Sequence, residues 1–133
     1  MGFSSKAEVY KAIIDLDDRV YQMNIEKHND IENYISAMMA MQQNKSNIIS
    51  ALIMMRAYYA YGQVLEEIED ERSRFKLESV WRKDTRALAD WLDENKNGTS
   101  RELGVYDKNV FEVERLMYNV FSSISEYLRK ELG

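Results

Sequence analysis

The sequence lacks cysteine and proline altogether, and its 133 residues include five glycines and a single histidine, His28. Without cysteine there are no disulfides, no thiolate nucleophiles and no cysteine-bound metals. One histidine cannot supply the paired ligands of a di-iron bundle or of a multi-histidine zinc site. Without proline, and with few glycines, little in the chain interrupts long helices. We therefore expect a helical protein that is not an enzyme and has no cofactor.

Composition and charge limit the class of protein further. Hydrophobic residues make up 45% and charged residues 31%, which is typical of a folded chain, and the length predicts one domain over residues 1–133. The net charge of −5 argues against binding to nucleic acid phosphates or to anionic lipid. The N-terminus shows no basic start followed by an apolar run, so we expect no secretory leader and a cytoplasmic location.

Capping residues and apolar periodicity predict where helices begin and end. Ser5 followed by Glu8 forms a capping box before a helix expected over residues 6–23. Asn29 with Glu32 three places later starts a second apolar stripe, and residues 44–47 offer a break. Residues 95–98 end a later helix, and Asp107 caps the last one.

The central stretch LIMMRAYYAYGQVL, residues 52–65, has almost no polar face. It predicts a long, nearly all-apolar central helix over about residues 47–72. Apolar side chains then continue at coiled-coil-like spacing to about residue 92. We expect a break or bend near Ser79 or Asp84, with one very long helix as the alternative. The fold class predicted is an all-α bundle of four to five helices.

A helix that is apolar all round must be surrounded by its own bundle, by a second chain or by lipid. Arg56 near the middle of the stretch argues against a membrane span. Tyrosine and methionine are typical of protein interfaces, which favours a homodimer over the alternative of a central helix in a monomer. The expected interface residues are Met54, Met55, Tyr58, Tyr59, Tyr61 and Leu65.

Two pairs of acids suggest an alternative function. Glu66 and Glu69 lie three residues apart on one helix, as do Asp90 and Asp93 on a later one. This layout resembles the all-α nucleotide pyrophosphohydrolases, and the resemblance implies a magnesium site that holds a nucleoside triphosphate. Arg86 departs from that family's pattern, because the family would place another acid there.

Two further segments carry weaker patterns. Residues 93–98 have side-chain oxygens at alternate positions and a glycine at the sixth, as in the first half of an EF-hand loop, but Gly104 stands where the bidentate glutamate is required. A helix-ending turn explains these residues better. Residues 72–86 mix basic side chains with Phe75 and Trp81, which is typical of proteins that bind single-stranded nucleic acid. An exposed charged face with four-residue ion pairs, or a docking strip for the acidic run of a second subunit, explains these residues better.

The function predicted from the sequence is that of a non-catalytic helical interaction protein that self-associates and presents helix surfaces to an unknown protein partner. Adaptors, inhibitor or immunity proteins, and virion or secretion accessory proteins act in this way. The alternative is the magnesium-dependent pyrophosphohydrolase, followed by a nucleic-acid-binding helical protein.

Overall fold

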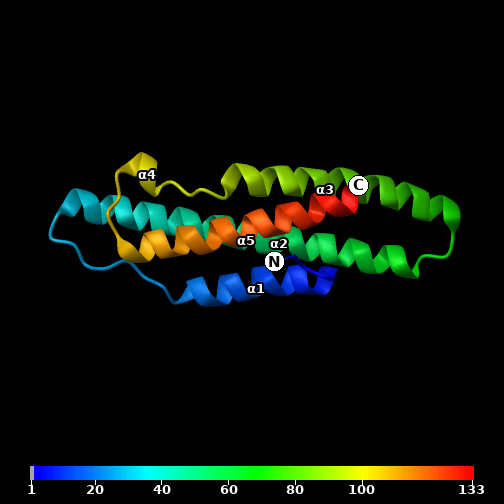
Figure 1. Ribbon diagram of the computed structural model, residues 1–133, viewed down its shortest axis with the longest axis horizontal. Helices are drawn as coiled ribbons and strands as arrows, with labels where there is room; N and C mark the ends of the chain where they lie inside the picture. Colours follow the sequence, from blue (N-terminus) through cyan, green and yellow to red (C-terminus); the bar gives the residue numbers. More distant parts are fainter. Residues whose placement is uncertain (1) are drawn as a thin grey trace.

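The computed structural model describes residues 2–133 and shows an all-α bundle (Figure 1). Its long helices are α1 (Lys6–Tyr21), α2 (Ile31–Glu67), α3 (Glu71–Asn95) and α5 (Lys108–Leu132), and a single turn, α4 (Ser100–Leu103), precedes α5. Consecutive long helices run in opposite directions along the bundle axis, and no strand occurs within residues 2–133 (Figure 1). The predicted all-α bundle is confirmed.

Aspartate or serine side chains fix where the long helices begin. Ser5 accepts a hydrogen bond from the Glu8 N–H at the start of α1, and Asp107 accepts from the Asn109 and Val110 N–H groups at the start of α5. Both caps satisfy N–H groups that have no partner within the helix. The predicted starts at Ser5 and Asp107 are therefore confirmed.

The predicted break at residues 44–47 is wrong. The helix α2 runs without interruption for 37 residues, about 55 Å. Asn44, which we expected to interrupt it, is fully buried and donates through Nδ2 to Glu114 of α5 at 2.9 Å. A tertiary hydrogen bond thus holds a turn-favouring residue inside the helix.

The predicted break near Ser79 or Asp84 is also wrong, since both residues lie within the continuous helix α3. The chain turns earlier, where Ile68 is extended and Asp70 caps α3 by accepting from the Ser73 N–H at 2.9 Å. The central helix therefore ends at Glu67 and does not reach residue 72. A short aspartate cap inside an acidic run determines the turn.

The core lies between the four long helices. Each of them contributes side chains that are fully or almost fully buried, and Phe121 is the largest that is fully buried. Within residues 2–133 no helix has the length and apolar character needed to cross a bilayer.

Candidate functional site

The helix α2 has two apolar faces, and only one of them faces the bundle. Its buried residues recur at helical spacing against α1, α3 and α5, and include Ala37, Ile48 and Met55. Its outward face carries a second row of large apolar side chains that are 48–72% exposed. This row consists of Ile31, Ile35, Met38, Met39, Ile49, Ile53 and Val64.

The outward row is the largest concentration of exposed apolar side chains that the structure shows on one helix. Single exposed apolar residues are ordinary, whereas several on one face of a helix are typical of surfaces that bind a partner. Between Met39 and Ile49 the exposed positions of this face are the polar Gln42 and Ser46. The row also explains why the sequence of α2 has no clear polar face. We regard it as the candidate functional site.

The six residues predicted to form a dimer interface lie toward the bundle. Met55 and Tyr58 are buried in the core of the chain itself, while Met54, Tyr61 and Leu65 are partly buried against it. The ring of Tyr59, also partly buried, lies 5.2 Å from that of Tyr10 in α1. The structure thus shows these side chains packing within one chain.

Tyr58 joins the core to the C-terminal end of α5. Its hydroxyl donates to Glu131, and its ring lies 6.1 Å from that of Trp81. Burial raises the pKa of Tyr58 well above its usual range, and the hydrogen bond with Glu131 and the charge of that carboxylate raise it further. Tyr58 therefore stays neutral and serves as a buried donor.

A shallow apolar groove of about 390 Å³ lies between α2 and α3. Met54, Tyr61 and Trp91 line it together with Ala57 and Ala87. Three of the predicted interface residues, Met54, Tyr58 and Tyr61, therefore line this groove.

The four acids predicted as an alternative magnesium site do not come together. Glu66 and Glu69 are exposed where α2 ends, whereas Asp90 lies about 28 Å along α3 from its first residue. Arg129 Nη2 donates to Asp90 at 2.9 Å and to Asp93 at 2.7 Å. Within residues 2–133 no group of three acidic or histidine side chains could hold a metal ion.

The segment that resembles half an EF-hand is a helix end. The helix α3 continues to Asn95, and Gly98 follows in the left-handed conformation with φ of 72°. A Cβ on Gly98 would stand 2.5 Å from Cδ of Glu114, so that both the backbone conformation and the space require glycine. Glu114 in turn accepts from Asn44 Nδ2 and from the N–H and hydroxyl of Ser100.

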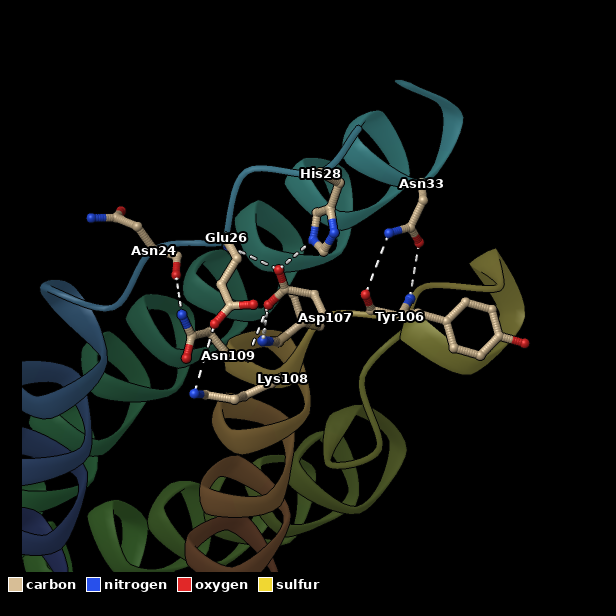
Figure 2. Close-up of polar contacts among 9 residues, drawn as sticks. Asn24, Glu26, His28, Asn33, Tyr106, Asp107, Lys108 and Asn109 are labelled. Carbon is tan, nitrogen blue, oxygen red and sulfur yellow. Dashed lines mark hydrogen bonds and ion pairs between the residues drawn. The ribbon is translucent and has the colours of Figure 1, made fainter. Parts of the chain in front are cut away.

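A buried carboxylate holds together the end of the bundle where α5 begins (Figure 2). Asp107 Oδ1 caps α5, and its Oδ2 accepts from the Glu26 N–H at 2.9 Å and from His28 Nε2 at 2.8 Å. Burial alone raises the pKa of Asp107, but the hydrogen bonds from Val110, His28, Glu26 and Asn109 outweigh it and hold that pKa below its usual range.

Two neighbouring asparagines complete this network (Figure 2). Asn33 of α2 accepts a hydrogen bond from the Tyr106 N–H through Oδ1 and donates to the Tyr106 carbonyl through Nδ2. Asn109 donates to the Asn24 carbonyl at 2.7 Å. His28, the one histidine, is thus a structural partner that ties the loop between α1 and α2 to the start of α5. This use of His28 was not visible in the sequence, because Asp107 is 79 residues away from it.

Comparison with known proteins gave no match to any family model, curated protein or solved structure.

Proposed function

We propose that this protein is a non-catalytic helical interaction protein that self-associates and presents helix surfaces to a macromolecular partner. The observation that supports the proposal is the exposed apolar row on the outward face of α2, from Ile31 to Val64. Adaptors, inhibitor or immunity proteins and accessory proteins of virions or secretion machineries use such preformed helix faces, which bind without a folding cost.

The energetics favour a partner on this face. Fully burying a large aliphatic side chain contributes about 1.5–3 kcal/mol relative to full exposure, and the residues of the row are roughly half exposed. Each one covered therefore adds on the order of 1 kcal/mol. Several covered together supply the apolar part of a specific interface.

Photocrosslinking in cells of the native host tests the proposal. A photoreactive amino acid at Ile53, on the outward face of α2, should crosslink to protein, either to the chain itself or to another one. The control places the same group at Asn119, an exposed polar position on α5. If Ile53 gives no more product than Asn119, the face is not an interaction surface and the proposal is wrong.

A further inference from the structure

We propose that the outward face of α2 binds a second copy of itself, running antiparallel, with the two-fold axis level with residue 44. This inference depends on the proposed function and specifies the partner and its register. It follows from the order of the side chains along the exposed face.

The exposed face contains an unbroken coiled-coil repeat. From residue 32 to residue 56, eight positions follow one another at alternating spacings of three and four, which is the a/d pattern of a two-stranded coiled coil. All eight side chains are exposed. They are Glu32, Ile35, Met39, Gln42, Ser46, Ile49, Ile53 and Arg56.

This repeat is symmetric about residue 44. In an antiparallel pair centred there, residues whose numbers add to 88 lie opposite each other, and each a position faces a d position. Ile35 then meets the partner's Ile53, and Met39 meets the partner's Ile49. Four apolar layers form in this way, two on each side of the axis.

The polar positions obey the same symmetry. Gln42 lies opposite the partner's Ser46 beside the axis, and a polar layer inside an apolar seam is the usual means of fixing register. At the two ends, Glu32 lies opposite the partner's Arg56. Arg56 uses Nε to donate to Tyr10 at 3.3 Å, and its terminal nitrogens can donate to the partner's Glu32.

A parallel pair would place like charges together. Glu32 would face the partner's Glu32, and Arg56 would face the partner's Arg56, which is unfavourable in both cases. The antiparallel pair converts both contacts into attractions. The sequence of charges along the seam therefore favours the antiparallel orientation.

The position of α1 fits the same arrangement. It lies beside α2 on the side of Lys45 and Tyr59, whose side chains contact Tyr21 and Tyr10 of α1. The two-fold axis brings the partner's α1 beside the opposite half of α2, where Met38 is 51% exposed. Lys45 lies near its own copy at the axis, but its ammonium is directed at the Tyr21 carbonyl at 3.3 Å.

Cysteine crosslinking distinguishes the orientations, since the chain has no cysteine of its own. In the proposed dimer Ile35 lies opposite the partner's Ile53 but about 27 Å along the axis from the partner's Ile35. A mixture of Ile35→Cys and Ile53→Cys chains should therefore form a disulfide-linked heterodimer under mild oxidation. Either variant alone should remain uncrosslinked.

Each other outcome overturns the inference. Disulfides within each single variant would show a parallel pair, and no disulfide in any mixture would show that these faces do not meet in this register. A charge exchange adds a second readout by sedimentation or light scattering. Glu32→Arg should weaken the dimer at least tenfold, and the double variant Glu32→Arg/Arg56→Glu should restore it, because both end contacts are then reversed but complementary.

The two proposals can fail separately. If Ile53 photocrosslinks only to other proteins, and the purified chain is strictly monomeric at high micromolar concentration, the antiparallel homodimer and the self-association are both wrong, while the presentation of this helix face to another macromolecule stands. Phe75→Glu provides the matched control, since Phe75 is 74% exposed on α3 and lies outside the seam. It should leave the mass unchanged, whereas Ile53→Glu should give monomers that remain folded.

Discussion

Replacing Asp107 with alanine removes the acceptor for four hydrogen bonds at once. The side chain is buried, caps α5 through Oδ1 and holds Glu26 and His28 through Oδ2. Its loss leaves the Asn109–Asn24 hydrogen bond to connect the loop after α1 with the start of α5. We expect this to be among the most destabilising single substitutions outside the apolar core.

The magnitude follows from the contacts. Loss of an N-cap costs about 1 kcal/mol, within a range of about 0.5–2. Hydrogen bonds to a charged group contribute about 1.5–3 kcal/mol each, and the lower value applies to those from Glu26 and His28, because water can reach these two residues. The sum is about 4 kcal/mol. For a chain of this size that corresponds to a fall in Tm of about 12–16 °C.

Urea and thermal unfolding followed by circular dichroism measure the effect, and Asp30→Ala is the matched control. Asp30 caps α2 by accepting from the Glu32 and Asn33 N–H groups, but it is exposed, and both of these hydrogen bonds lie within α2. Its loss should cost about 1 kcal/mol. If Asp107→Ala costs no more than Asp30→Ala, the view that Asp107 is a tertiary anchor is incorrect.

Three further expectations concern pH, glycine and a buried hydroxyl. The pKa values of Asp93 and Asp107 lie below those of the same groups in the unfolded chain. Their contribution to the free energy of unfolding is therefore complete above about pH 4 and is lost as the pH falls through the folded-state pKa values. In an acid titration, Asp107→Asn should lose less of its stability with falling pH than the unsubstituted protein does. Gly98→Ala should lower the free energy of unfolding by about 2–3 kcal/mol, and Gly104→Ala by about 1 kcal/mol. Both glycines have positive φ, but only at Gly98 would the added Cβ crowd the Glu114 side chain. Urea titration of the two variants measures the difference. Tyr58→Phe should cost about 1 kcal/mol in the same assay, because it removes only the hydroxyl donor, and no loss would show that this bond is unimportant.

The starts of α1 and α5 were predictable because capping is local. Ser5 and Asp107 lie within three residues of the N–H groups that they cap, so a short window of sequence contains the whole interaction. The helix end at residues 95–98 was predictable for a similar reason, because Gly98 supplies the left-handed conformation that follows it.

The continuity of α2 through Asn44 was not predictable, since it depends on a distant partner. Asn44 looks like a helix breaker until Glu114, 70 residues away, supplies its hydrogen bond. The coiled-coil-like spacing around Asp84 suggested a seam with a bend. In the structure Trp81, Thr85 and Leu88 lie on the continuous helix α3 and are buried in the core of the bundle.

The stretch of residues 52–65 predicted a seam with a second chain at its tyrosines, but Met55 and Tyr58 are buried within the bundle, and only Ile53 and Val64 of the stretch belong to the exposed apolar row of α2. Toward its C-terminal end the outward face changes to Arg56, Ala60 and Gln63, while Tyr58 turns inward. The large exposed side chains are concentrated between residues 31 and 53. A partner that covers these exposed apolar side chains must therefore be centred near residue 44, which is the centre of symmetry of the proposed seam, and not near the tyrosines.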